Sequence, residues 1–332
     1  MADTVGNQAA GNQAAIEVTE RRRFNFRASA AGDKLFNGLT AGLAILIVTV
    51  LFALLAVLIV GAWPSLRAFG LHFLISTDWD PTNDQYGALP FIYGTAVSSG
   101  LALLIAVPLS LGVGLCLSEM APVWLSRRLG FLVELLAAIP SVVYGLWAIF
   151  VLGPWLRDHV EPTLGKYLGF LPFFQGPRVA VSMLNASIVL AIMVLPYIAA
   201  VMTDVFRAVP RTNREAALAL GATKWEMVRM AVLPFGTSGL IGAVIFGLGR
   251  ALGETIAVAM VIGNRAEISA SLFMPSTTLA SVIANEFVEA TSAMNVSALI
   301  ELGLVLLVLA FIMNVLARGL VLGATHRFRG VK

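Results

Sequence analysis

Hydrophobic residues along this chain gather into six long runs that shorter, more polar stretches separate. Each run reaches the ~20 residues that an α-helix needs to cross about 30 Å of hydrocarbon. The pattern therefore predicts an all-α polytopic membrane protein with six transmembrane helices. The predicted spans are Leu39–Trp63, Ile92–Leu117, Leu129–Leu156, Val179–Phe206, Phe235–Ile262 and Val296–Leu322.

The composition excludes a water-soluble fold as the main body of the protein. A length of 332 residues would suit two soluble domains, but 58% of the residues are hydrophobic and only 12% are charged. A globular domain carries roughly 25% charged residues. The single cysteine, Cys116, rules out an intrachain disulfide and a cysteine-rich metal site.

The chain begins with a polar segment, 1–34, in which the pentapeptide Gly6–Ala10 repeats directly as Gly11–Ala15. Such a segment buries too little apolar surface to offset its ordering entropy, and it predicts a disordered, basic cytoplasmic tail. Its terminal arginines form either a solvated charge run or an anchor on anionic lipid head groups. After the tail we expect a first transmembrane helix at 35–63, an extracytoplasmic loop at 64–90, a five-helix core at 91–323 and a second basic cytoplasmic tail at 324–332.

Basic residues are unevenly divided between the two sides of the predicted bundle. The tail, the second and fourth connections and the C-terminal end hold 16 of the 22 Lys and Arg, whereas the other three connections hold 5 and Arg250 lies within a span. Positive charge accumulates on the cytoplasmic side of membrane proteins. Both termini are therefore expected in the cytoplasm, with Asp78, Asp80 and Asp84 outside.

Three of the inner spans contain a proline near their middle, namely Pro108, Pro140 and Pro196. Each proline removes a backbone hydrogen bond and kinks its helix, and the freed carbonyl must find a partner in a neighbouring helix or in water. Two interpretations remain open. The kinks either serve packing alone or belong to a bundle that opens and closes around a path.

The fourth connection, 207–234, has the pattern of two short helices joined by a tight turn. Two capping-box spacings occur in it, Thr212 with Glu215 and Thr223 with Glu226. Gly221 between them suits the left-handed residue that ends a helix. We expect this unit at the cytoplasmic face, with the next span beginning at Leu233-Pro234.

Two other interpretations of the 207–234 unit fit its residues less well. A DNA-reading helix-turn-helix needs a row of polar base-reading groups, whereas the second helix offers Trp225, Met227, Val228 and Met230. An amphipathic helix in the head-group region would be basic, whereas the first helix is small and apolar. A small and apolar helix of this kind is better suited to docking in a partner's groove.

The residues of this unit resemble the EAA loop of bacterial ABC importer permeases. The pattern consists of Glu215, Ala216, Ala217, Gly221, Leu233 and Pro234 at the family's spacing. Ala231 departs from it, because a larger aliphatic residue usually stands there. The resemblance implies the type I ABC importer permease fold, also called MetI-like, for 91–323. It also implies that these six residues couple the chain to an ATPase subunit.

Three further stretches resemble the phosphate-specific permeases of the PstC type, namely Gly247–Asn264, Gly87–Thr95 and Glu134–Gly145. This resemblance implies one membrane subunit of an ATP-driven phosphate importer in the bacterial cytoplasmic membrane, working by alternating access. The implied partners are a PstA-like second permease subunit, a PstB-like ATPase dimer and a PstS-like extracytoplasmic phosphate-binding protein. No cofactor is expected on this chain itself, because ATP and Mg would bind the ATPase. A permease for another oxyanion is the alternative.

Charged residues within the predicted spans are costly and are functional candidates by default. Arg250 and Glu254 are four residues apart, which places both on one face of a helix. An arginine can grip an oxyanion with two parallel hydrogen bonds. A carboxylate can accept the proton that phosphate keeps near neutral pH, and it would repel sulfate, which has none. The resemblance assigns this pair to the substrate path, while a mutual, purely structural ion pair is the other interpretation.

Glu134 and Glu301 are the remaining acids within spans, and each either serves packing or pairs with Arg250 across helices. In a different class of function, a channel or proton-coupled transporter, they would form a proton relay with Glu254.

The sequence has no phosphate-binding loop of the Gly-x-x-x-x-Gly-Lys-Ser/Thr type, so the chain is not the ATPase. Its three histidines lack metal-ligand spacing, and neither a catalytic triad nor nucleic-acid binding is expected.

Overall fold

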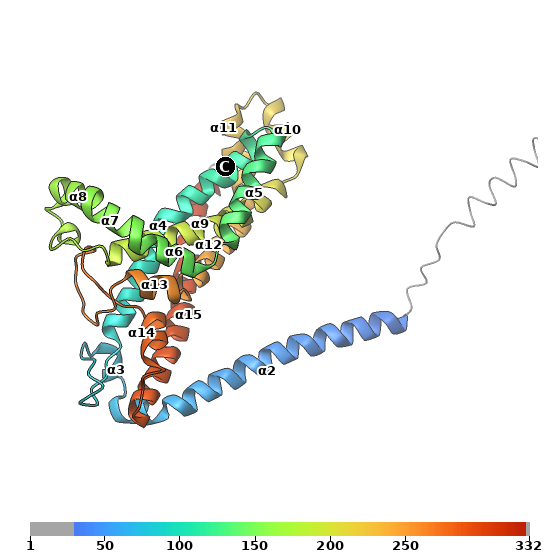
Figure 1. Cartoon of the computed structure of the whole chain (residues 1–332). Helices are drawn as coiled ribbons and strands as arrows, with labels where there is room; N and C mark the ends of the chain where they lie inside the picture. The colour runs from blue at the N-terminus through green and yellow to red at the C-terminus, as the bar shows by residue number, and fades with distance from the viewer. Residues whose placement is uncertain (1–29, 330–332) are drawn as a thin grey trace, which may run out of the picture. The chain divides into compact units, whose positions relative to one another are not determined.

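The computed structural model describes residues 30–329, and every regular element among them is a helix (Figure 1). Two isolated β-bridges, Asp80 with Gln85 and Gly263 with Ser276, are the only ladder contacts in this range. The prediction of an all-α protein is therefore confirmed. The long helices are α2 (Ala30–Phe69), α4 (Leu89–Leu115), α5 (Val123–Ala138), α9 (Met183–Arg207), α12 (Leu233–Leu252) and α15 (Ala293–Arg329).

Shorter helices and turns connect these long helices. The short α-helices are α3 (His72–Ile75), α6 (Ser141–Trp147), α7 (Gly153–Trp155), α8 (Glu161–Leu168), α10 (Arg211–Ala219), α11 (Lys224–Met227), α13 (Ile256–Val261) and α14 (Leu279–Glu286). Wider π-helical turns are η1 (Cys116–Met120), η2 (Ala148–Leu152), η3 (Leu156–Val160) and η5 (Val228–Val232), and η4 (Pro172–Phe174) is a 3₁₀ turn.

Five helical segments are long and apolar enough to cross a membrane, and a sixth is obtained if one sharply bent pair counts as a single span. The five are Gly32–Phe69, Leu89–Met120, Met183–Arg207, Lys224–Leu252 and Ala293–Gly319, and the bent pair is Val123–Ala138 with Ser141–Leu168. These segments match the six predicted spans in order. The first helix extends beyond the predicted 35–63 at both ends, and α15 continues to Arg329. Residues 1–29 of the predicted tail lie outside the described range.

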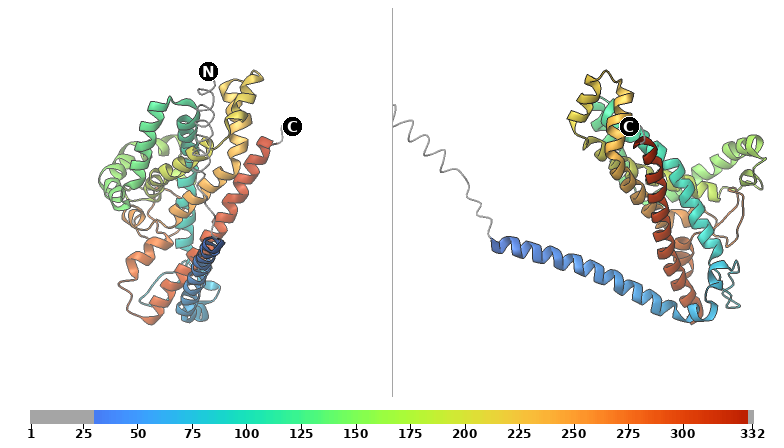
Figure 2. Two further views of the ribbon diagram at one scale, coloured as in Figure 1. Left: turned by 90° about the vertical axis from the view of Figure 1, so that its right-hand side faces the viewer. Right: turned by 180° about the vertical axis from the view of Figure 1, so that it is seen from behind.

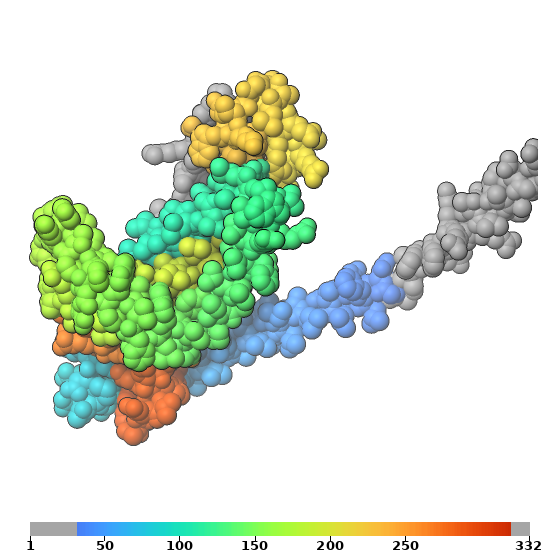
Figure 3. Space-filling view, turned by 45° about the horizontal axis from the view of Figure 1, so that its top comes forward, coloured from blue at the N-terminus to red at the C-terminus, as the bar shows by residue number. Residues whose placement is uncertain are grey.

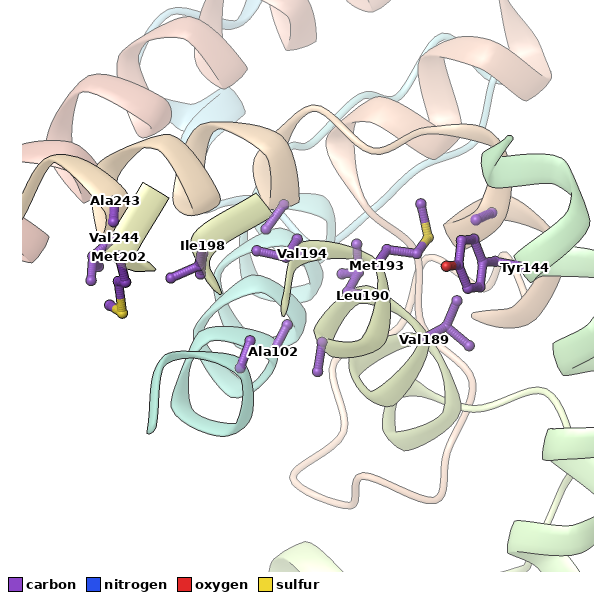
Figure 4. Close-up of a cluster of buried hydrophobic side chains, with 14 of the residues drawn as sticks. Ala102, Tyr144, Val189, Leu190, Met193, Val194, Ile198, Met202, Ala243 and Val244 are labelled. Carbon is purple, nitrogen blue, oxygen red and sulfur yellow. The ribbon is translucent and has the colours of Figure 1, made fainter. Parts of the chain in front are cut away.

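The chain forms two compact units, Met1–Val57 and Leu58–Lys332, and the boundary falls inside α2. The second unit is organised around α9, which is the most deeply buried of the candidate spans. Its apolar side chains contact α4, α6 and α12, and Figure 4 shows Met193 of α9 beside Tyr144 of α6 and Ile198 among residues of the same cluster. Helix α9 is therefore packed directly against all three neighbours.

Small residues allow close contacts within the second unit. A Cβ added at Gly247 of α12 would stand 2.4 Å from the Ile198 side chain of α9. A Cβ at Gly94 of α4 would stand only 1.9 Å from the backbone oxygen of Thr277. The neighbouring Thr95 hydroxyl accepts a 2.9 Å hydrogen bond from Leu279 N at the start of α14. The side chain is therefore absent at Gly94 because a backbone segment occupies its place.

The last turns of α2 are fastened to α15 by a single hydroxyl group. Pro64 lies inside α2 and interrupts its hydrogen-bond ladder. The Ser297 hydroxyl accepts a 3.1 Å hydrogen bond from Ser65 N and donates one of 2.9 Å to Gly61 O. These two groups lie four residues apart and would normally bond to each other in a straight helix. Ser297 thus bridges the opened turn and satisfies both of its polar groups.

The third predicted span is not one kinked helix, so the expectation for Pro140 needs correction. Helix α5 ends at Ala138 and α6 begins at Ser141, with Pro140 as the residue preceding α6. The two helices meet at 88°. A proline disfavours the helical conformation of the residue before it, and Ile139 is accordingly extended. Pro140 therefore breaks the span, whereas Pro108 and Pro196 lie inside continuous helices, α4 and α9.

The connections between α2 and α4 and between α13 and α15 pack together through an aromatic cluster. The Trp79 ring meets Phe91 edge-on at 4.9 Å and Tyr86 at 5.2 Å. Its indole N–H donates a 2.8 Å hydrogen bond to Glu286 of α14. Burial raises the pKa of the Glu286 carboxyl, and the hydrogen bond from Trp79 opposes that shift. Through Trp79 this cluster joins the connection between α2 and α4 to the start of α4 and the end of α14.

Candidate functional site

Arg250 and Glu254 meet at an interruption of the fifth predicted span. Helix α12 ends at Leu252, residues 253–255 are not helical by their hydrogen bonds, and α13 begins at Ile256. Gly253 in the break has a low helix propensity, and only the Gly249 backbone oxygen lies near the place of a Cβ there. The structure therefore corrects the expectation of one continuous helix over Phe235–Ile262.

The two charged side chains form an ion pair across the start of this break. Arg250 Nη2 lies 3.4 Å from Glu254 Oε2, and the two side chains are 39% and 5% exposed. The pair is unsymmetrical, because the Glu254 side chain is buried and the Arg250 side chain is partly exposed. Glu254 Oε1 also accepts a 3.4 Å hydrogen bond from Ala257 N in the first turn of α13. Amide groups at a helix start favour a negative charge, so α13 helps to hold the carboxylate.

A third residue, Tyr197 of α9, holds the guanidinium from another side. The Arg250 guanidinium carbon lies 5.4 Å from the centre of the Tyr197 ring, within the range of a cation–π contact. The Tyr197 hydroxyl donates a 2.6 Å hydrogen bond to Ala137 O at the end of α5, and its ring contacts Phe246 of α12 at 6.2 Å. Tyr197 therefore connects α9, α12 and the break between α5 and α6. Its role could not be predicted from the sequence, because a contact between helices leaves no spacing signal.

The arrangement leaves most donors of Arg250 unengaged. Within the described residues, Glu254 and the Tyr197 ring are its recorded polar and aromatic partners, and the Arg250 side chain is 39% exposed. Nothing lies within 4 Å of a Cβ built at Gly249, the residue before it. An oxyanion can therefore approach the open edge of the guanidinium.

The 207–234 connection forms the helical pair that its pattern predicts. Helix α10 (Arg211–Ala219) is followed by a turn in which Gly221 has φ +85°, and then by α11. The capping box of Thr223 and Glu226 is present. The Glu226 carboxylate accepts a hydrogen bond from Thr223 N, and the Thr223 hydroxyl accepts one from Glu226 N. In Figures 1 and 2 this pair stands at one end of the second unit, opposite α3 and α14.

Two details of the connection differ from the prediction. Thr212 is not a capping residue, because α10 already begins at Arg211 after Pro210. Helix α12 begins at Leu233, as predicted, but it is not separated from the helical pair, because α11 continues through η5 into α12. Pro234 has no N–H to donate, and the wider π turn just before it, where Leu233 N bonds Val228 O, accommodates that loss. Motion of α11 is thus passed directly into the helix that carries Arg250.

The small residues of α10 line an open groove of about 900 Å³ at this end of the molecule. Figure 3 shows the surrounding segment projecting from the surface. Four of the six residues of the EAA-like pattern lie in its walls, namely Ala216, Ala217, Gly221 and Pro234. Glu215 is exposed on α10 beside them, and Leu233 packs partly buried against the core. Leu220 and Met230 also line the groove and are exposed. The structure therefore joins these residues into one apolar surface.

The two other acids of the spans lie apart from Arg250. Glu134 is exposed on α5 and lines a cleft of about 580 Å³ together with Arg127 and Arg207. Glu301 of α15 is 2% exposed, and its Oε2 has no hydrogen-bond partner among the described residues. In this part of the chain neither acid forms an ion pair, so the pairing with Arg250 across helices is not observed.

A matching family model and similar individual proteins both indicate the same family. The family model described as binding-protein-dependent transport system inner membrane component matches residues 106–323. A phosphate transport system permease protein PstC of Haemophilus influenzae is 48% identical over 290 residues, covering 86% of this chain and 92% of its own length. The PstC of Mesorhizobium japonicum is 42% identical, covering 93% of this chain and 96% of its own length.

Among solved structures, the chain is similar to an inward-facing form of the MetNI methionine ABC transporter. The TM-score is 0.47 at 20% sequence identity, with 70% of this chain and 94% of that chain covered.

Proposed function

Because the chain belongs to the family of binding-protein-dependent transport system inner membrane components and, within it, to the PstC phosphate transport permeases, we propose that it forms part of a path for inorganic phosphate across the bacterial cytoplasmic membrane. The chain is the transport subunit, and ATP hydrolysis belongs to a separate ATPase. The single observation that supports the path most strongly is the half-open Arg250 beside the buried Glu254 in the α12–α13 break.

The chemistry of this pair suits phosphate. The exposed edge of a guanidinium offers parallel N–H donors that match two oxygens of a tetrahedral anion. Near neutral pH phosphate retains at least one proton, which Glu254 can accept as a hydrogen bond. Sulfate brings only lone pairs to the same carboxylate, and the resulting repulsion disfavours it. The pair thus combines an attraction for phosphate with a penalty against the closest competing oxyanion.

Transport also requires a link to an energy source, and the α10–α11 unit is suited to provide it. Its groove presents small residues such as Ala216 and Gly221 together with exposed Met230, a surface that fits an apolar element of a partner. We assign the partner as a PstB-like ATPase dimer that carries the ATP and Mg. A PstA-like permease subunit would complete the path, and a PstS-like protein would deliver phosphate. Both termini would face the cytoplasm, as the distribution of Lys and Arg indicates.

The test is phosphate uptake by cells that carry Arg250→Gln in place of the native chain. The substitution removes the donor fork but keeps a polar side chain of similar length. We expect uptake to fall by about tenfold or more, the loss typical of a charge-assisted contact to a bound anion. Immunoblots of the membrane fraction must show normal amounts of the chain. Full uptake at normal amounts would refute the assignment of Arg250 to the path.

A further inference from the structure

One ion pair in the second unit has no part in the path described so far. It joins Arg214 of α10 to Glu119 of η1, residues that are 95 positions apart. Arg214 Nε lies 3.0 Å and Nη2 2.7 Å from the two oxygens of the Glu119 carboxylate, so the contact is bidentate. The side chains are 18% and 6% exposed. The pair is therefore shielded from solvent at the end of the molecule that carries the open groove.

The same guanidinium also binds the end of α9. Nη2 donates a 2.7 Å hydrogen bond to Phe206 O, and Nη1 donates to Val209 O. The last carbonyls of a helix lack partners within the helix, and a cation near them is favourable. One side chain of α10 therefore fastens three segments together: the start of α10, the C-terminal end of α9, and η1, which continues α4.

Two of these segments belong to helices at the candidate path, since α9 contacts Arg250 and α4 packs along α9. Helix α9 carries Tyr197, whose ring lies against Arg250, about two and a half turns before the residues that Arg214 binds. Helix α4 packs along α9 and is linked to it by the Ser110 hydroxyl, which donates a 2.9 Å hydrogen bond to Leu195 O. The polypeptide connection from α10 leads through α11 and η5 into α12, so it does not run through α4 or α9. A displacement of α10 reaches α4 and α9 through Arg214.

We propose that the Arg214–Glu119 pair is the positioning contact that transmits motion of the ATPase-facing helix α10 to α4 and α9, and through Tyr197 to Arg250. This inference rests on the proposed function. The EAA-like pattern does not include either residue of the pair. Because the guanidinium makes four hydrogen bonds from three nitrogens, a lysine cannot reproduce the contact. The pair is not a substrate contact, and its loss leaves the Arg250 side chain intact.

The experiment compares phosphate import with ATP hydrolysis in the complete transporter reconstituted in proteoliposomes. The variants are Glu119→Gln, which preserves size and shape, Arg214→Gln, and the two combined. We expect each single variant to lower the phosphate imported per ATP hydrolysed by about tenfold, within the range of measured coupling energies between sites. The combined variant should be no worse than Arg214→Gln alone, because that substitution already removes the contact with Glu119 together with the hydrogen bonds to Phe206 O and Val209 O.

The control is Arg157→Gln, which removes an ion pair of the same 2.7 Å length with Asp158 whose side chains are 45% and 51% exposed. It should leave the ratio unchanged, since exposed pairs contribute little. A ratio that stays at the native value in Glu119→Gln, or losses that multiply in the combined variant, would overturn the inference. Glu119→Gln decides alone if Arg214→Gln does not assemble. A native complex that imports no phosphate would instead contradict the proposed function.

Discussion

Arg250 is held on two sides and open on the third, and this geometry separates two interpretations of the charged pair. A guanidinium whose purpose is to neutralise a buried carboxylate would be expected to bury its donors against it. Here the Glu254 side chain is 5% exposed and the Arg250 side chain is 39% exposed, and the two charged groups lie 3.4 Å apart, at the long end of an ion pair. Glu254 is also stabilised by Ala257 N. The carboxylate therefore does not depend on Arg250 alone, and the arginine is available to a ligand.

Glu254→Gln should weaken the discrimination between phosphate and sulfate. Glutamine keeps the shape of the side chain but carries no charge, so the repulsion of a fully deprotonated oxyanion is lost. Repulsion between like charges at close range amounts to several kcal/mol. We expect sulfate to compete with phosphate uptake at concentrations about tenfold lower or more. Uptake assays with unlabelled sulfate as competitor measure this effect, with Glu267→Gln at an exposed pair as the control. Unchanged competition by sulfate would show that Glu254 has no role in selection.

Tyr197 should affect phosphate binding through its ring and not through its hydroxyl. A cation–π contact contributes about 0.5–2 kcal/mol, which corresponds to a roughly 2- to 30-fold change in a binding constant. Tyr197→Leu should raise the half-saturating phosphate concentration within that range. Tyr197→Phe keeps the ring, loses only the hydrogen bond to Ala137 O, and should leave the value near native. Equal shifts in the two variants would mean that the ring does not position Arg250.

The sequence could suggest Arg250 and Glu254 because a charge in an apolar run is conspicuous without any structure. The same reasoning could not reveal Tyr197 or Glu119. Tyr197 is one polar aromatic residue in a span, and Glu119 is one acid near the end of another. Their contacts with Arg250 and Arg214 depend on how helices pack, which neither periodicity nor spacing records. Contacts between residues far apart in the chain therefore could not be predicted from the sequence.

At the scale of helices, the six apolar runs were predicted correctly in order, while their interruptions were not. Apolar length determines which segments can span, and it is unaffected by a local break. At the break of Gly253–Thr255 the Glu254 side chain accepts a hydrogen bond from Ala257 N, and after the break at Ile139–Pro140 helix α6 packs against α13. A proline or a glycine within a run can be accommodated in a helix, as Pro108 and Pro196 show. Tertiary packing decides between the two outcomes.

Gly94→Ala should destabilise the protein, and Gly100→Ala on the same helix should not. The new methyl group at Gly94 would stand 1.9 Å from Thr277 O, a backbone atom that cannot rotate away, whereas nothing lies within 4 Å at Gly100. Overpacking of this kind costs about 1–3 kcal/mol. Replacement of a helical glycine by alanine without a clash gains up to about 1 kcal/mol. Thermal unfolding of the purified protein in detergent compares the two variants. A melting temperature of Gly94→Ala equal to or above that of Gly100→Ala would contradict the packing described for α4.

At the scale of the whole molecule, the second unit combines three features on helices that touch one another. The groove of α10 and α11 lies at one end, α9 runs through the core, and Arg250 lies at the break after α12. The α11–η5–α12 segment is continuous, and Arg214 binds the end of α9. A partner seated in the groove therefore acts on α12, which carries Arg250, and on α9, whose Tyr197 contacts it. This is the arrangement that alternating access requires, because closure at one end must reorient groups within the path.

The most direct test of the central claim is the uptake of radiolabelled phosphate and sulfate by proteoliposomes that contain this chain with its partner permease, ATPase and binding protein. The account predicts accumulation of phosphate that depends on ATP at the ATPase side, with sulfate accumulating far more slowly. It also predicts that uptake is lost when Arg250→Gln replaces the native chain in an otherwise complete assembly. Uptake of phosphate that continues without nucleotide and without the ATPase would contradict the account, and would favour a channel or a proton-coupled transporter that uses Glu134, Glu254 and Glu301.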